Sequence, residues 1–109
     1  MKFIITESKL ENIIFKYLDN QDFVVMNEDE YIYFLNSESD NYAQIKFDKY
    51  DSWCNISIAL IDEISSFFSM REYDSERVIV RWIEDTLQMK VTNILPTAFG
   101  QGSELTISN

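Results

Sequence analysis

The sequence predicts an α+β protein, in which a small antiparallel sheet of three to five strands packs against about three helices. Two observations support this fold class. Apolar residues recur at helical spacing in three separate stretches, and they alternate with polar residues in stretches between them. The links between the alternating stretches are too short for the crossovers that parallel strands require, so neighbouring strands should pair antiparallel.

The first helix is predicted to begin after Thr6 or Ser8, because either residue can cap it. Ser8 and Glu11 have the spacing of a capping box, while Thr6 is a competing cap two residues earlier. The apolar residues that follow are three and four apart and form one face, comprising Leu10, Ile13, Ile14, Tyr17 and Leu18. The polar run at residues 19–22 should end this helix.

A meander of three or four short antiparallel strands is predicted between residues 23 and 58. Residues 23–26 and 31–35 flank an acidic turn, and the second of these stretches is apolar on both faces. A polar loop at residues 36–41 leads to a hairpin whose turn lies at residues 49–52. Its inward-facing residues alternate along the chain and are Ala43, Ile45, Phe47, Cys54, Ile56 and Ile58.

Two further helices and a last strand complete the predicted domain. Helical spacing returns at Ala59, and a third helix follows that Asp74 or Ser75 can cap. The apolar residues of these two helices are Leu60, Ile61, Ile64, Phe67, Phe68, Val78, Ile79, Trp82, Ile83 and Leu87. Residues 90–95 should form the last strand, at an edge of the sheet, and Pro96 should end it.

Length and composition indicate one domain. The chain has 109 residues, of which 46% are apolar, so it can form a core without disulfides. We expect a domain at residues 1–96 and a polar C-terminal tail at 97–109. Cys54 is the single cysteine, which fits a reducing compartment. The apolar run at residues 3–5 is too short for a signal peptide, and no run approaches a membrane span, so a soluble cytoplasmic protein is expected.

The net charge of −10 restricts the classes of partner. Nucleic acid and anionic membranes are bound chiefly through Lys and Arg, so neither is an expected direct partner. An acidic surface can attract a basic protein, including one that binds nucleic acid. The same charge can also serve solubility alone, and the sequence does not decide between these two interpretations.

The residue content argues against most enzyme chemistry. The chain has no histidine, which is the commonest general base and metal ligand. Cys54 alternates in phase with Ile56 and Ile58, so it should be a buried structural residue rather than a nucleophile. The acidic groups at 28–30 and 38–40 lack calcium-loop spacing, and the Gly100–Gly102 segment lacks the features of a phosphate loop. We therefore expect no cofactor, no metal and no enzyme activity.

Aromatic residues near two turns are the remaining functional candidates. Tyr31 and Tyr33 lie on a strand with two apolar faces, and Tyr50 and Trp53 bracket a hairpin turn. An exposed aromatic patch with an acidic rim would indicate a protein interface. Alternatively, the first helix covers this second face of the sheet. The candidate partner-binding residues are Tyr31, Tyr33, Tyr50, Trp53, Glu28, Asp29 and Glu30.

The opening MKFIITESKL resembles a loose group of short, uncharacterised proteins of tailed bacteriophages and marine metagenomes, which often open M-K-x-I-I-T-E-S-x-L. The later phrases IALIDEISSFFSM and VIVRWIEDTLQMKVTNILP are similar to the body of that group. The resemblance implies a viral origin and a place in the host cytoplasm or the virion, and it implies no activity.

Together these features predict a small, acidic, non-enzymatic phage protein that binds a protein partner, either a host factor or a virion component. One alternative is an acidic mimic of nucleic acid that inhibits a host DNA- or RNA-binding protein. The other is an enzyme that acts on a small substrate through carboxylates.

Overall fold

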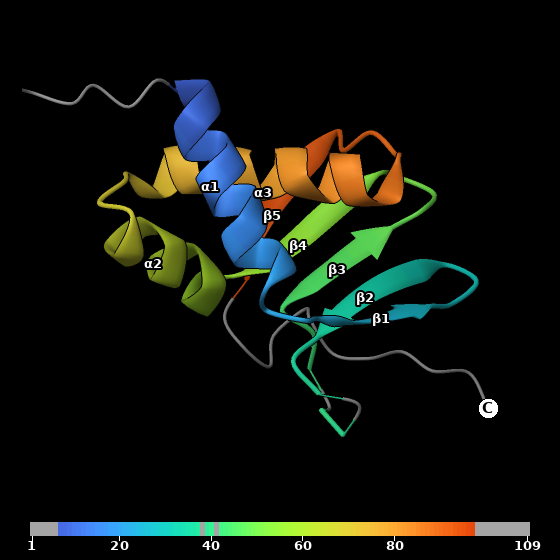
Figure 1. The fold of residues 1–109 in the computed structure, drawn as a ribbon. Coiled ribbons are helices and arrows are strands. Elements are labelled where there is room, and N and C mark those ends of the chain that lie inside the picture. Colours follow the sequence, from blue (N-terminus) through green and yellow to red (C-terminus); the bar gives the residue numbers. More distant parts are fainter. Residues whose placement is uncertain (1–6, 38, 41, 98–109) are drawn as a thin grey trace, which may run out of the picture.

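The computed structural model describes residues 7–37, 39–40 and 42–97, which form three helices and five strands (Figure 1). In chain order the elements are α1 (Glu7–Asp19), β1 (Val24–Asn27), β2 (Tyr31–Leu35), β3 (Ile45–Asp48), β4 (Trp53–Ser57), α2 (Ile58–Phe67), α3 (Glu72–Leu87) and β5 (Asn93–Thr97). The predicted α+β class is confirmed.

The five strands form one sheet in the order β1-β2-β3-β4-β5. The first four strands are a meander in which each strand pairs antiparallel with the next, as predicted. The last strand differs, because β5 pairs parallel with β4. Helices α2 and α3 separate these two strands in the chain, and they supply the long crossover that a parallel pair requires.

Pro96 lies inside β5 and does not end it, contrary to the sequence-based prediction. It is opposite Ile56 of β4, and the strand continues to Thr97. The reason is position: β5 is at the edge of the sheet and hydrogen bonds on one side only. A proline on an edge strand can direct its missing N–H away from the neighbour, so no ladder hydrogen bond is lost.

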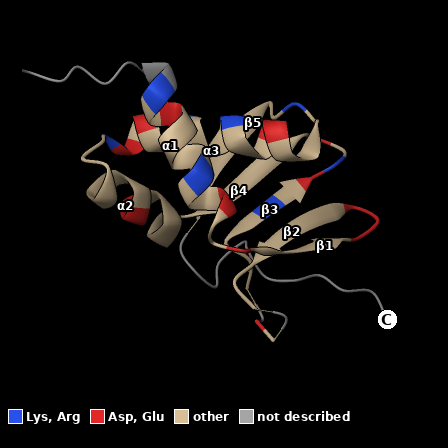
Figure 2. Cartoon of the chain, in the orientation of Figure 1, with Lys and Arg blue, Asp and Glu red and all other residues tan. Residues whose placement is uncertain are grey.

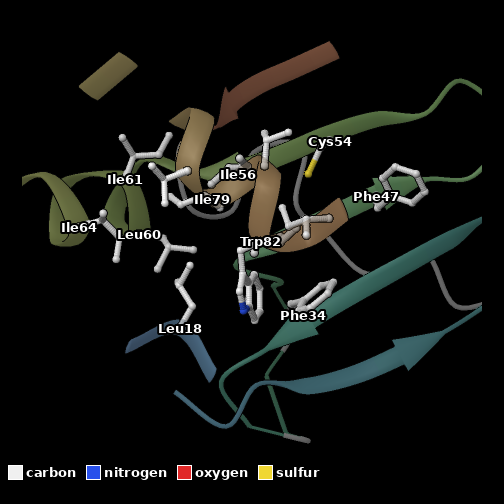
Figure 3. Packing of buried hydrophobic residues seen from close by; sticks show 14 of the residues in the cluster. Leu18, Phe34, Phe47, Cys54, Ile56, Leu60, Ile61, Ile64, Ile79 and Trp82 are labelled. Carbon is white, nitrogen blue, oxygen red and sulfur yellow. The ribbon is translucent and has the colours of Figure 1, made fainter. Parts of the chain in front are cut away.

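All three helices pack on the same face of the sheet, and the main core lies between them (Figure 1). Leu18 of α1 and Trp82 of α3 pack near Phe34 of β2, while the isoleucines of α2 and α3 cover Ile56 of β4 (Figure 3). The alternative in which α1 covers the second face is therefore wrong. The stripe of α2 is also shorter than predicted, because Phe67 is 67% exposed. Its ring centroid lies 5.0 Å from those of Tyr17 and Phe68.

The opposite face of the sheet has a smaller apolar cluster. Tyr33, Leu35 and Ala43 are fully buried there, and Val24, Met26 and Tyr31 pack around them. This second cluster explains why residues 31–35 are apolar throughout: Ile32 and Phe34 face the helices, while Tyr33 and Leu35 face the other side. A strand with two buried faces lacks the polar alternation of a half-exposed one.

Ser57 makes the junction between the sheet and the helix layer. Its hydroxyl donates to Gln44 Oε1 at 2.6 Å and accepts from the backbone N–H of Leu60 at 3.1 Å. The second contact caps α2, so Ile58 begins this helix instead of ending β4 and is 43% exposed. Ser57 is itself buried, so both hydrogen bonds are shielded from water.

Candidate protein-binding surface

Two hairpin turns meet at one end of the sheet. Antiparallel pairing places the β1–β2 and β3–β4 connections at the same end, and a backbone hydrogen bond of 2.9 Å from Lys49 to Glu30 joins them. The Lys49 amine also donates to Asn27 Oδ1 and to the carbonyl of Glu28. We call this region the turn end and define it by Glu28, Asp29, Glu30, Tyr31, Asp48, Tyr50, Asp51 and Trp53.

Three of the four predicted aromatic residues are accessible at the turn end. Tyr50 is 80% exposed and Trp53 is 39% exposed, while Tyr31 is half-buried. In the sheet register Tyr31 is opposite Asp48, and Asp48 is opposite Trp53. Directly opposed residues of antiparallel strands share a face, so these three side chains form a row on the face away from the helices.

Tyr33 does not belong to this surface, which corrects the sequence-based prediction. Its side chain is fully buried, and its neighbours in the register are Met26 of β1 and Lys46 of β3. Strands on both sides cover it, whereas Tyr31 lies next to a turn. The centroids of the two tyrosine rings are 5.9 Å apart, so Tyr33 packs against Tyr31. Because Tyr33 is buried, it cannot contact a partner itself.

The turn end is rimmed by carboxylates. Asp29 and Glu30 are exposed and Glu28 is half-buried, and the acidic β1–β2 turn lies at the same end of the sheet as the β3–β4 turn (Figure 2). Glu30 directly precedes Tyr31, so the predicted acidic residues adjoin the aromatic row. Asp48 and Asp51 join them from the β3–β4 hairpin, and sequence reasoning missed both. Both residues belong to the segment DKYDSW, which contains Tyr50 and Trp53. They can be assigned to the acidic rim only when the two turns are known to share one end of the sheet.

Asp48 also shapes the turn that presents Tyr50. Its Oδ1 accepts hydrogen bonds from the backbone N–H of Tyr50 at 2.8 Å and of Asp51 at 3.3 Å. Aspartate side chains commonly bond the backbone two residues on in this way and stabilise tight turns. Ser52 completes the reversal with a φ of 58°. The position of Tyr50 is therefore set by local hydrogen bonds.

The electrostatics of the turn end keep the Tyr31 phenol neutral. Burial raises the pKa of Tyr31, and the nearby charges of Asp48, Glu30 and Asp51 act in the same direction. The Lys46 amine lies 4.3 Å from the centroid of the Tyr31 ring, a cation–π geometry that holds the ring in place. The result is an aromatic surface inside a negative potential.

The structure offers little for other chemistry in the residues it describes. Cys54 is fully buried, and desolvation raises the pKa of its thiol to about 12, so its reactive thiolate is suppressed. Across residues 7–37, 39–40 and 42–97, no three Cys, Asp or Glu side chains are grouped so as to hold a metal ion. Glu38 and the Gly100–Gly102 segment lie outside the described residues.

In the same part of the chain, no helix has both the length and the apolar character needed to cross a membrane. Comparisons with protein-family models, curated proteins and solved structures give no match to this chain. The resemblance of its sequence to bacteriophage proteins therefore stays a prediction, and function has to be argued from the geometry of the turn end.

Proposed function

We propose that this chain is a small, phage-encoded, non-enzymatic protein that binds a protein partner through the turn end. One observation carries the proposal: Tyr50 is 80% exposed in the β3–β4 turn, and Trp53, 39% exposed, begins the strand that follows it, with carboxylates around both. The partner is a host factor or another component of the virion, so the protein acts in the host cytoplasm or in the particle.

The residue types at the turn end are those that supply binding energy and specificity. Tyrosine and tryptophan dominate the energetic hot spots of protein interfaces, because they bury a large rigid surface at low entropic cost. Acidic rim groups act mainly on specificity and on the rate of encounter. The complementary partner therefore carries a shallow apolar recess for Tyr50 and Trp53, with Lys or Arg around it.

An acidic nucleic-acid mimic is the second candidate, supported by the net charge of −10 and by the five carboxylates at the turn end. In a mimic the carboxylates supply most of the affinity and the aromatic residues little. The two functions therefore differ in which variant abolishes binding. They also differ in salt dependence, because affinity for a phosphate-reading groove falls steeply with salt.

The enzyme alternative has less support. A carboxylate acid–base pair needs a site in which burial or a like charge shifts one pKa relative to the other. Among the described carboxyl groups, the pKa of Glu76 is raised, by partial burial and by Glu72. Both residues are on α3, which packs on the helix-covered face, so this pair is unrelated to the aromatic surface.

The test is affinity capture of the tagged chain from phage-infected cell lysate at low and high salt, with mass spectrometry of purified particles alongside. Three variants separate the candidates: Tyr50→Ala with Trp53→Ala, a neutralised rim (Glu28→Gln, Asp29→Asn, Glu30→Gln), and Phe67→Ala as a control. Phe67 is as exposed as an interface aromatic, but it lies on α2 at the other end of the molecule.

We expect one protein to be captured by the wild type and by Phe67→Ala, and to be lost with the Tyr50 and Trp53 double variant. Retention by that double variant, with loss in the neutralised rim and at high salt, would indicate the mimic instead. The proposal is wrong if no protein is recovered at either salt concentration and the chain is absent from particles.

A further inference from the structure

The three arginines of this acidic chain line one hollow. Arg71, Arg77 and Arg81 are its only arginines, and all three border a cavity of about 410 Å³ between α1 and the first half of α3. This cavity lies on the helix layer, and the α2–α3 link that borders it is at the opposite end of the molecule from the β1–β2 turn (Figure 1). The arginines are therefore gathered away from the turn end, in a cavity that Glu11 and Asp74 also line.

The residues that line this cavity, called the groove below, extend along α3. Arg71 is the residue before the helix and Arg81 is ten residues further on, which corresponds to about 15 Å at 1.5 Å per residue. Its apolar lining comes from Leu10 of α1, Met70 of the α2–α3 link and Val78 of α3. A groove with apolar lining residues and arginines spread along ten residues of chain suits an extended chain better than a single small ion.

The three guanidinium groups differ in what they already bind. The Nε of Arg81 pairs with Glu11 Oε1 at 2.8 Å, and Arg77 lies 5.7 Å from the centroid of the Tyr73 ring. The Arg71 guanidinium has no hydrogen bond or ion pair with any residue that the structure describes. Asp74 also borders the groove and offsets part of the charge. Arg81 is thus the arginine already paired with a carboxylate, while Arg71 and Arg77 offer their full set of guanidinium donors.

The start of α3 lies beside Arg71, and Glu72 and Asp74 in its first turn offset part of the positive charge there. The sequence predicts that Asp74 or Ser75 caps this helix, but neither does. The cap residue is Arg71, and it makes no side-chain capping hydrogen bond. Ser75 is buried and bonds to the Ser65 hydroxyl at 2.8 Å. The first N–H groups of α3 are therefore without a side-chain cap, at the positive end of the helix dipole.

We propose that this groove binds an extended acidic segment of a protein partner. Carboxylates of the segment pair with Arg71 and Arg77, because guanidinium groups bind carboxylates through paired hydrogen bonds. Apolar side chains of the segment contact Leu10, Met70 and Val78. About four or five residues of extended chain span the groove at about 3.3 Å per residue. The net charge of −10 repels such a segment elsewhere, so the arginines confine it to this groove.

The direct test is a titration of the full ¹⁵N-labelled chain with the capped peptide Glu-Leu-Glu-Leu-Glu, followed by NMR. In an extended peptide the three glutamates share one side and the leucines the other. We expect shifts of backbone amides at residues 69–81 and none at the turn end. The peptide Lys-Leu-Lys-Leu-Lys is the matched ligand control, and we expect it to leave the amides of residues 69–81 unshifted.

The protein variants are Arg71→Ser with Arg77→Ser, compared with Lys16→Ser with Lys90→Ser, which removes the same charge from exposed sites outside the groove. The arginine variant should bind the acidic peptide about tenfold more weakly, and the lysine variant should stay within about twofold of the wild type. Both variants should retain the wild-type circular dichroism and melting curve, because all four side chains are exposed.

Three results would overturn the proposal. One is the absence of amide shifts at residues 69–81, and another is unchanged affinity in the arginine variant. The third is binding of inorganic phosphate as tightly as the peptide, which would make the groove a simple anion site. The Tyr50 and Trp53 double variant should bind the peptide normally, so failure of this groove and failure of the turn-end function are separately visible.

Discussion

The helix-covered face of the sheet and its turn end use aromatic residues in opposite ways. On the helix-covered face, the Phe34 ring lies 5.4 Å from Trp82 and 6.2 Å from Phe23, and Phe34 and Trp82 are almost fully buried. At the turn end Tyr50 is 80% exposed. The difference shows that position in the sheet, rather than residue type, decides whether an aromatic side chain stabilises the fold or is available to a partner.

The largest effect is expected where the helix-covered face is most tightly packed. Phe34→Ala should lower the free energy of unfolding by about 3–5 kcal/mol, because it removes a buried ring and leaves a cavity beside Trp82. Urea denaturation followed by tryptophan fluorescence measures the change. A loss below about 1 kcal/mol would mean that the helices are less closely packed on this face than the contacts indicate.

The ionisation of Cys54 tests how completely the helix-covered face excludes water. Burial raises the pKa of its thiol from 9.0 to about 12. Below pH 9 the thiol is neutral in both states and adds no pH dependence. Above pH 9 it ionises in the unfolded state first, so the unfolded state binds fewer protons and stability falls by about 1.4 kcal/mol per pH unit.

Cys54→Ala should remove this contribution, so its stability should fall less steeply than that of the wild type between pH 9 and pH 11. Urea denaturation of both proteins at a series of pH values gives the comparison. The lysines and tyrosines are the same in both proteins, so their contributions to the pH dependence cancel. Identical pH dependence in the two proteins would contradict a buried thiol.

Ser57 tests the junction between sheet and helix layer. Ser57→Ala should cost about 1–2 kcal/mol, because it removes the cap of α2 and leaves Gln44 without its hydroxyl donor. Ser57→Thr keeps a hydroxyl and serves as the matched control. Thermal melting followed by circular dichroism measures both. An equal loss in the two variants would point to crowding at the site instead of lost hydrogen bonds.

The smallest effect on stability is expected at the turn end. Tyr50→Ala should change the free energy of unfolding by less than about 0.5 kcal/mol, because the side chain is mostly in water. The same urea experiment, run beside Phe34→Ala, measures it. A loss of about 2 kcal/mol or more would show that Tyr50 supports the fold, and it would remove the contrast on which the proposed interface depends.

Local patterns predicted much of the fold. The helix α1, the inward alternation of Ile45, Phe47, Cys54 and Ile56, and the turn at residues 49–52 depend on side chains close in sequence, and the structure confirms them. Three members of the predicted patterns differ: Ile13 is 47% exposed, Ile58 is 43% exposed, and Ala43 packs in the cluster on the opposite face. Predictions that depended on distant neighbours were less successful. Tyr33 was expected at the surface, and its burial results from pairing with strands on both sides.

The candidate sites divide in the same way. Tyr50, Trp53 and the acidic residues 28–30 could be identified from the composition of two turns. The structure then showed that these two turns lie at the same end of the sheet. Asp48 and Asp51 could not be added without the strand register. The arginine groove was also invisible, because the side of α3 that faces α1 depends on how the two helices pack.

The sequence by itself determined the class of the protein and most of its elements, since helical and strand periods arise from the backbone geometry of each segment. Only the tertiary structure decided that all helices share one face and that β5 runs parallel to β4 at an edge that accepts Pro96. It also decided that the three arginines line one cavity, away from the turn end. These outcomes depend on contacts between residues far apart in the chain, which no local pattern specifies.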